Sequence, residues 1–443
     1  MTFVEAKIVK SRRTEKRVVV GRIESAASQI LLSAPLKENE NEIYLCYSRK
    51  YFRSGGLLDL ALRGTRPLDI IAARTNAGNS QVFYQALLCY AILVFGNDHG
   101  QAHITKQGYA MRGVALRQLN QALSDPKCYT QDSVILSVVT MAILECVVPT
   151  GPNHYLQHMI GLERLLELRG PGLYRSQESS LVFKDLRHMI LFASLCTGKP
   201  SILANQEWKA VLRANCSDEE LQEQDLFDVL ADCTVLISER NNLLATWSSD
   251  LEKSARKRDI IKQRGLELLA DLHAWKRRWD GNTRNSYSEN STLLGQDTSS
   301  PFSTVYEFSD HRATVMFMFY NTTLIYVLQI LASLPLSINN NNLDQSLAQG
   351  TSWNAGYQGD FWNLPSEQFI AMERSAALQV CRCIPYYLDW KSKSNVELSP
   401  VVHWAVTQAW RTLGGHESAE GRWMRDILNR DGRRVIAQAL WAR

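Results

Sequence analysis

The spacing of apolar residues along the chain predicts helices and very little else. Residues 82–95 are almost continuously apolar, which is the composition of a helix buried on every side. Apolar positions then recur every three or four residues through 101–123, 130–145 and 153–169, the period of an amphipathic helix. Because only short polar links join these four segments, we expect them to pack as antiparallel neighbours in a bundle.

The segment 153–169 carries the clearest signals. Tyr155, Met159 and Leu162 fall on one face at helical spacing. Gly170 follows, at the point where a helix end needs a backbone conformation with positive φ, and the proline after it cannot continue the helix. We therefore expect this helix to end immediately before Gly170.

Helices also account for most of the remaining sequence. No run of any length alternates apolar and polar residues with the period of two that strands require. Two polar stretches, 281–303 and 337–362, are predicted to be loops on either side of one very apolar helix. The predicted fold class is all-α, a large multi-helix bundle or array with two polar loop insertions. Further helices are expected at 181–196, 225–247, 251–279, 311–334, 367–383, 401–413, 419–430 and 433–441.

The chain divides into a basic arm at 1–25 and a helical domain at 26–443. Within the domain we distinguish a helical core over 81–196 and a C-terminal helical half over 197–443. A solvated tail without a specific role fits the composition of the arm. Its basic cluster also suits nuclear import or contact with phosphate, and consists of Lys10, Arg12, Arg13, Lys16 and Arg17.

Charge is concentrated in that arm. The 443 residues carry a net charge of +4, and the first 22 hold seven Lys and Arg against two Glu, a local +5. The rest of the chain is therefore close to neutral, which argues against a broad nucleic-acid-binding surface. A basic stretch with tryptophans at 251–279 is interpreted as the solvated face of a helix whose Trp residues pack inward, with phosphate or base contact as the alternative.

The cysteines do not form a metal site by their spacing. All nine are irregularly placed, mostly inside apolar helical patterns, which is typical of reduced thiols in an intracellular protein. Cys381 and Cys383 are the one close pair, and two residues at this spacing point to different faces of a helix. We predict no metal there.

One segment, 315–334, has about the length and apolarity of a membrane span. Asn321, Thr322 and Thr323 interrupt it, and no basic anchor follows its end. We interpret it as a buried core helix and expect no contact with a membrane.

The sequence contains none of the common catalytic motifs in complete form. His416 and Glu417 begin a zinc-protease motif, but position 420 is Glu instead of the second His. Neither a Gly-x-Ser-x-Gly elbow nor a dinucleotide-binding Gly-x-Gly-x-x-Gly occurs. His154 and His158 lie one turn apart, a spacing that two metal ligands can share, although we expect one to pack inside the bundle.

Several short motifs, taken in order, resemble the fungal-specific transcription factor domain family, the regulatory region of fungal zinc-cluster transcription factors. An apolar helix ends near Glu145, and an aromatic-x-x-His-x-x-Gly helix follows and ends in Arg-Gly. Thr197–Leu203, followed by Glu207-Trp208, is similar to the family's Gly-x-Pro-x-x-Leu and Glu-Trp elements. The motif residues, for which the resemblance implies structural roles, are Glu145, Tyr155, His158, Gly161, Arg169, Gly170, Pro385 and Tyr386.

The resemblance implies a nuclear regulator of genes transcribed by RNA polymerase II, not an enzyme, that acts through partner contacts. The implied partners are transcription proteins, full-length relatives or a second copy of the chain. The family reads DNA with a cluster of six cysteines that hold zinc, and only Cys46 lies in the first 88 residues here. We therefore expect DNA contact to be indirect or weak, and no cofactor unless an N-terminal zinc cluster is missing from this chain.

Two other hypotheses remain open. A helical enzyme or small-ligand-binding protein would reuse the same bundle, with His154, His158 and Glu145 as the first candidates for its pocket. A cytosolic interaction protein without a role in transcription would also fit the composition.

Overall fold

A computed structural model describes residues 38–49, 80–151, 153–174, 177–214, 216–247, 250–291, 300–335, 364–394 and 399–429. The basic arm at 1–25, the helix predicted at 433–441 and the whole loop predicted at 337–362 lie outside these residues. The chain separates into two compact units, Met1–Glu42 and Ile43–Arg443, and the second is described here.

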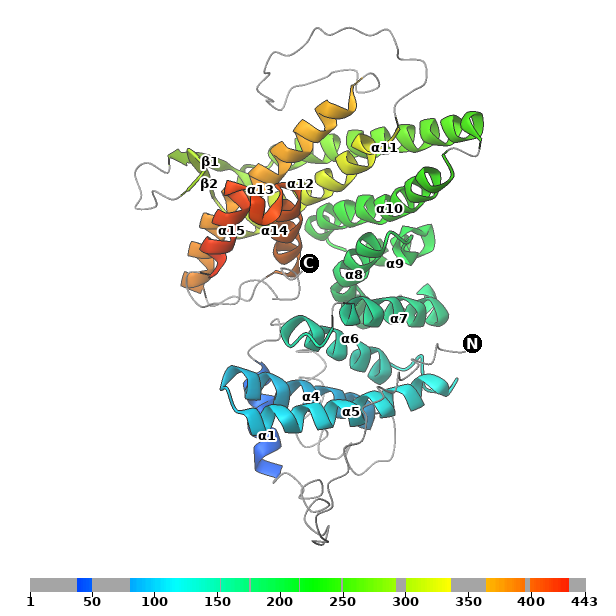
Figure 1. The fold of residues 1–443 in the computed structure, drawn as a ribbon, viewed down its shortest axis with the longest axis vertical. Helices are drawn as coiled ribbons and strands as arrows, with labels where there is room; N and C mark the ends of the chain where they lie inside the picture. The colour runs from blue at the N-terminus through cyan, green and yellow to red at the C-terminus, as the bar shows by residue number, and fades with distance from the viewer. Residues whose placement is uncertain are drawn as a thin grey trace, which may run out of the picture. The chain divides into compact units, whose positions relative to one another are not determined.

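The all-α prediction is confirmed, and Figure 1 shows coiled ribbons in nearly every coloured part of the chain. Short 3₁₀ turns lie at Pro171–Tyr174, Ile202–Ala204, Thr283–Asn285 and Gly415–Glu417. The α-helices are α1 (Glu38–Ser48), α4 (Ser80–Asp98), α5 (Ala102–Ser124), α6 (Asp132–Val147), α7 (His154–Arg169), α8 (Gln177–Thr197), α9 (Gln206–Ala214), α10 (Asp218–Thr246), α11 (Leu251–Asp280), α12 (His311–Ala332), α13 (Ser366–Ser394), α14 (Pro400–Thr412) and α15 (Ala419–Asn429).

The four predicted core helices are α4 to α7, and neighbours in sequence pack on one another. Helices α4 and α5 pack closely on each other, and Gly108 of α5 lies against Leu93 of α4. A Cβ atom at Gly108 would lie 2.6 Å from Cγ of Leu93, so a larger residue does not fit without movement. Helix α6 packs against α4 and α7, and α7 continues the array to α8.

Helix α10 begins at Asp218 with an acidic run, seven residues before the start predicted at 225. Ser217 and Glu220 form a reciprocal cap: the Ser217 hydroxyl accepts from the Glu220 N–H, and the Glu220 carboxylate accepts from the Ser217 N–H. Acidic residues here also suit the positive end of the helix dipole.

Helix α12 is the centre of the C-terminal half and packs against α10, α11, α13 and α14. It is long and apolar enough to cross a membrane, but 83% of its most apolar window is buried inside the protein. Its polar residues are satisfied within the helix: side chains of Asn321, Thr322 and Thr323 donate to carbonyls one turn earlier, at 2.8, 2.8 and 3.0 Å. The interpretation as a buried core helix is therefore confirmed.

The prediction that 281–303 is a loop without strands was wrong at one point. Residues Tyr287–Ser291 form β1, which pairs antiparallel with β2 (Thr304–Phe308), with Tyr287 opposite Phe308. Strand β2 does alternate, since Tyr306 and Phe308 are buried and Glu307 is exposed. Five residues are too short a run to stand out in the sequence.

One arginine of α13 attaches the hairpin to the rest of the protein. Arg382 donates to the carbonyl of Thr304 at 3.1 Å and to the Tyr306 hydroxyl at 2.6 Å, and its guanidinium lies 4.0 Å from the centre of the Tyr306 ring. A local sequence pattern cannot predict this contact, because Arg382 is more than 70 residues away from the strand.

Candidate functional site

One family-like motif residue of the helical core, Glu145, is a buried carboxylate at the centre of a side-chain cluster. Glu145 is close to the C-terminal end of α6, and its side chain is only 1% exposed. Arg112 of α5, with 17% of its side chain exposed, donates to Oε1 and forms an ion pair with it. A buried carboxylate needs such partners, because loss of its hydration is costly.

The turn after α6 supplies the other donors. Prolines at 149 and 152 bound Thr150 and Gly151, and this turn folds back over the end of α6. The Thr150 N–H donates to Oε2 of Glu145 at 2.9 Å, and its hydroxyl lies 2.8 and 2.9 Å from the two carboxylate oxygens. Glu145 thus fixes the connection between α6 and α7.

His154, at the start of α7, completes the cluster. Its Nδ1 lies 2.8 Å from the Thr150 hydroxyl and 3.8 Å from Oε2 of Glu145. The hydroxyl has one proton, and an ionised carboxylate can only accept. Thr150 therefore donates to Glu145, and Nδ1 of His154 carries the proton that it donates to Thr150.

His154, rather than His158, lies beside Glu145, because its Nδ1 contacts the Thr150 hydroxyl. Burial lowers the pKa of His158 to about 4, with Arg112 and His154 acting in the same direction and Glu145 opposing them. His158 is consequently neutral at neutral pH and packs as a buried imidazole.

These contacts favour a structural role for the cluster. Both oxygens of Glu145 accept hydrogen bonds from Arg112 and Thr150. Among the described residues, no group of three His, Cys, Asp or Glu side chains is arranged to hold a metal ion. What the arrangement does is to lock three helices and one turn together.

A second buried carboxylate, Glu163 in α7, was missed by sequence reasoning. It accepts from the Ser201 hydroxyl at 2.7 Å, from the Ile202 N–H at 2.8 Å and from the Ser194 hydroxyl at 3.3 Å. Burial raises the pKa of Glu163, although these hydrogen bonds oppose the shift. The sequence did offer one signal for this site, because Glu163 is a charged residue within the helix predicted at 153–169.

Glu163 explains why the Thr197–Leu203 motif has a fixed conformation. Gly198 in this turn has φ of +65°, and a Cβ there would lie 2.7 Å from Nδ2 of Asn241. The Ser201 N–H donates to the Thr234 hydroxyl of α10 at 2.9 Å. The motif is therefore a joint between α7, α8 and α10.

The remaining motif residues are distributed over separate contacts. Tyr155 packs edge-on against Phe192, 6.2 Å between ring centres, and burial raises its pKa well above the ordinary value. Arg169 forms an ion pair with Asp132 of α6. A Cβ at Gly161 would meet nothing within 4 Å.

In the C-terminal half the two motif residues lie within α13. Pro385 is inside the helix, where it removes one backbone donor. Tyr386 lies 5.7 Å, between ring centres, from Phe308 of β2. Tyr386 thus joins the hairpin to α13, and both residues are far in sequence from the Glu145 cluster.

The tryptophans of the basic segment 251–279 pack inward, as the structural interpretation of that segment predicts. Trp275 and Trp279 of α11 are each only 2% exposed, and Trp275 stacks on Tyr320 of α12, 5.4 Å between ring centres. Neither ring is available for stacking on a base. The import candidates Lys10, Arg12, Arg13, Lys16 and Arg17 lie outside the described residues.

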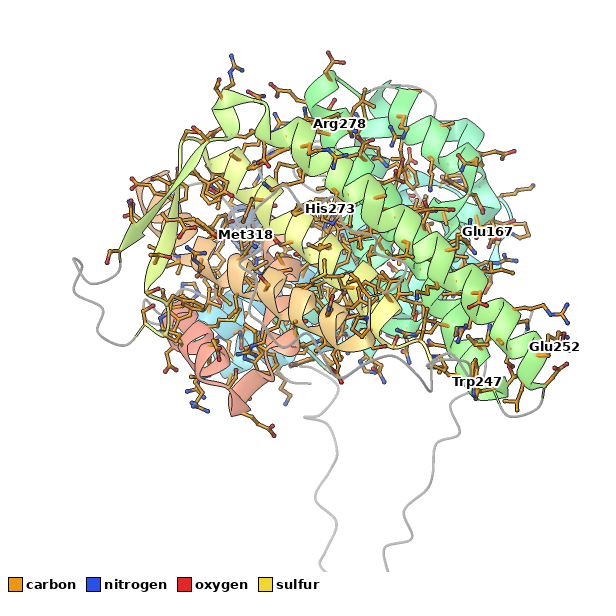
Figure 2. All side chains as sticks on the ribbon, turned by 90° about the horizontal axis from the view of Figure 1, so that it is seen from above. Glu167, Trp247, Glu252, His273, Arg278 and Met318 are labelled. Carbon is orange, nitrogen blue, oxygen red and sulfur yellow. The ribbon has the colours of Figure 1, made fainter. Side chains whose placement is uncertain are left out.

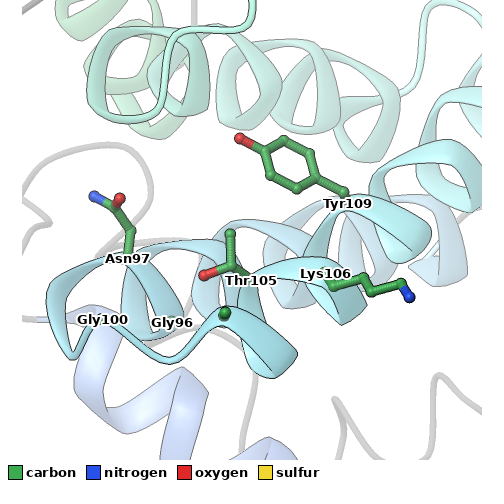
Figure 3. A pocket seen from close by; sticks show the side chains of 7 residues that line it. Gly96, Asn97, Gly100, Thr105, Lys106 and Tyr109 are labelled. Atoms are coloured by element: carbon green, nitrogen blue, oxygen red, sulfur yellow. The ribbon is translucent and has the colours of Figure 1, made fainter.

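A shallow, open depression of about 410 Å³ lies where α4 turns into α5. Figure 3 shows Asn97 and Tyr109 beside it, with the Lys106 side chain extending away from Asn97. Its lining includes none of the motif residues, so it does not connect with the Glu145 cluster. The lining residues are Gly96, Asn97, Gly100, Ala102, Thr105, Lys106 and Tyr109.

Comparison with known proteins supplies the family. A curated protein of Emericella nidulans, described as uncharacterized, is 30% identical over 161 residues, which is 36% of this chain and 34% of that protein. The chain thus spans about a third of the length of the curated relative that it matches. No solved structure is a significant match. The family model described as "Fungal specific transcription factor domain" matches residues 58–352, and two-thirds of the chain lies within that range. The chain therefore belongs to the fungal-specific transcription factor domain family.

Proposed function

We propose that this protein is a nuclear regulator of transcription that acts through protein contacts of its helical domain. The observation that carries the proposal is the family match over 58–352, which includes α4 to α11 and the whole Glu145 cluster. The chemistry of that cluster agrees with it, because Glu145, Arg112 and Thr150 satisfy one another instead of facing a substrate.

The proposal gives DNA a secondary place. Outside the arm, the sequence is close to neutral, and the Trp residues of the basic segment 251–279 are buried. Binding to duplex DNA depends on many cations that contact phosphate. We therefore infer that transcription proteins or relatives with their own DNA-binding module bring this chain to promoters.

The test places the full chain in a fungal nucleus. A fluorescent fusion is expected to accumulate there, and replacing Lys10, Arg12, Arg13, Lys16 and Arg17 by Ala should shift it toward the cytosol. The matched control replaces Lys127 and Lys199, two exposed lysines of the helical domain, and should leave localisation unchanged.

A second readout tests regulation itself. The chain, fused to an unrelated DNA-binding module, is expected to raise or lower expression of a reporter that carries the module's site. If the fluorescent fusion stays in the cytosol and the fusion to the DNA-binding module leaves reporter expression unchanged, the proposal is overturned. An interaction protein without a role in transcription would then be favoured.

A further inference from the structure

Helix α11 has a buried inner face and an outer face that no described element covers. Figure 2 shows α11 at the front, running from Arg278 to Glu252. The inner face includes Gly265, where a Cβ would lie 2.8 Å from Cδ2 of Leu331 in α12. This close approach fixes the rotation of the helix and so determines which side chains point outward.

The outer face carries a stripe of residues with alternating steps of four and three. This is the spacing that keeps side chains in line along a helix and forms the seam between paired helices. Five of the six residues are exposed, and Ile260 has 57% of its surface accessible. The stripe consists of Lys253, Lys257, Ile260, Arg264, Glu267 and Asp271.

The order of charges along this stripe is complementary to its own reverse. Lys253 and Asp271 lie nine residues to either side of position 262, and Lys257 and Glu267 lie five residues to either side. A second α11 that runs antiparallel would therefore place a cation opposite an anion at four points. Ile260 would lie beside the aliphatic part of Arg264 of the other copy.

We propose that two copies of this chain associate through antiparallel α11 helices, with a twofold axis near residue 262. A twofold interface uses one patch twice, so a patch must be complementary to itself, and this stripe meets that condition. The inference rests on the proposed function in one respect: self-association is one of the partner contacts through which such a regulator would act.

The charges that the dimer would pair make no ion pair inside one copy among the described residues, and Glu267 accepts one hydrogen bond there, from Gln263 at 3.1 Å. The ammonium groups of Lys253 and Lys257 and the carboxylate of Asp271 make no ion pair within 4 Å in the part of the chain that is described. Neighbouring charges are already neutralised, since Arg256 pairs with Glu252 and Arg264 with Glu239. The unpaired charges are therefore concentrated at the ends of the stripe.

The local potential at Asp271 agrees with this arrangement. Partial burial raises the pKa of Asp271, the neighbouring carboxylate of Glu267 raises it further, and Arg278 opposes the shift. Two carboxylates one turn apart on a helix repel each other. Lysines of a second copy would relieve that repulsion.

Duplex DNA fits the same face less well. Lys253 and Lys257 would attract phosphate, but Glu267 and Asp271 on the same line would repel it within about 27 Å of helix. A contact of that length is also small for a stable interface, so we expect a weak, salt-sensitive dimer.

The first experiment measures the mass of the full chain by analytical ultracentrifugation at about 50 mM salt, where surface charges are poorly screened. K253E/K257E and E267K/D271K should each weaken dimerisation by at least about tenfold, because each makes the stripe repel itself. An equimolar mixture of the two variants should recover the dimer, since all four charge pairs are restored in reversed sense. K127E/K199E changes the net charge by the same amount as K253E/K257E but at a different place on the surface, and it should dimerise as wild type does.

The second experiment locates the contact. Two copies of Ile260 would lie about 6 Å apart along the helix axis, so Ile260→Cys should be joined by a short bismaleimide. Ile370→Cys on α13 is a matched control, because Ile370 is 54% exposed. Wild type gives the background from Cys46, which is exposed.

Each outcome decides the matter. The proposal is overturned if the wild-type chain stays monomeric at 100 times the concentration at which a weak dimer should begin to form. It is also overturned if the wild-type chain dimerises and both charge variants form the same dimer. If K253E/K257E loses DNA binding while its mass in the ultracentrifuge equals that of wild type, the face contacts phosphate instead of a second copy. All these measurements use purified protein, so their failure is distinguishable from failure of the nuclear and reporter tests.

Discussion

At the scale of single residues, two buried carboxylates account for the fixed geometry of the helical core. Glu145 holds the turn between α6 and α7, and Glu163 holds the turn between α8 and α9. In both cases the carboxylate accepts from a backbone N–H and from a hydroxyl: those of Thr150, five residues away, for Glu145, and those of Ile202 and Ser201 for Glu163. These side chains replace the backbone pairing that a turn lacks.

The first prediction concerns the charge of Glu145. Glu145→Gln keeps the shape but leaves the Arg112 guanidinium, which is 17% exposed, without its anion. We expect a loss of about 2–3 kcal/mol in the free energy of unfolding, measured with urea, which is below the cost of breaking a fully buried pair. Glu207→Gln, at an exposed position in α9, is the control and should change stability by less than about 0.5 kcal/mol. An equally small effect at Glu145 would show that the pair with Arg112 contributes nothing.

At the scale of elements, helix existence was predictable because the apolar periodicity is strong and local. Predicted and observed ends of α5, α6 and α7 differ by only one or two residues. The short elements were the misses: α9 has nine residues and β1 five, too few for a period to be visible. Both depend on partners distant in sequence, such as Arg382 for the hairpin.

The end of α7 allows a matched pair of glycine substitutions, which is the second prediction. Gly170 has φ of +76° and ψ of 157°, a conformation that is essentially confined to glycine, and positive φ was expected there from the sequence. Gly170→Ala should lower stability by about 1–3 kcal/mol.

The control lies in the same helix. Gly161 is inside α7, and its Cβ would meet nothing within 4 Å, so Gly161→Ala should raise stability by up to about 1 kcal/mol through helix propensity. The two melting temperatures should therefore move in opposite directions. A shift in the same direction for both would mean that the backbone at Gly170 is not constrained as described.

At the scale of the whole molecule, the order of motifs along the chain does not tell how their residues meet in space. Glu145, Tyr155 and Arg169 were singled out from their order along the chain, and each proves to make a contact that joins elements. The partners of Glu145 were not predictable, because Arg112 is 33 residues away. His154 and His158 could not be told apart either, since rotation about the helix axis depends on tertiary packing.

Folding of the whole molecule should depend on pH through its buried imidazoles, which is the third prediction. Burial lowers the pKa of His158 to about 4, below its ordinary value of 6.5. The unfolded chain therefore binds the proton first as pH falls. The stability that neutral His158 contributes is fully present above pH 6.5 and is lost between pH 6.5 and 4, by up to about 3 kcal/mol.

His311 adds a second group of the same kind. Burial lowers its pKa to about 4 as well, with Asp310 opposing the shift, and its ring stacks on Tyr387. Buried acids such as Glu163 have raised pKa values and act in the opposite direction over the same range, so the total curve does not isolate one residue. The informative quantity is the difference between wild type and His158→Gln, measured by urea unfolding at several pH values. The variant should lose less stability than wild type from pH 7 to pH 5, because one proton fewer is taken up on unfolding. Parallel curves for the two proteins would mean that His158 titrates alike in both states and is not buried as the geometry requires.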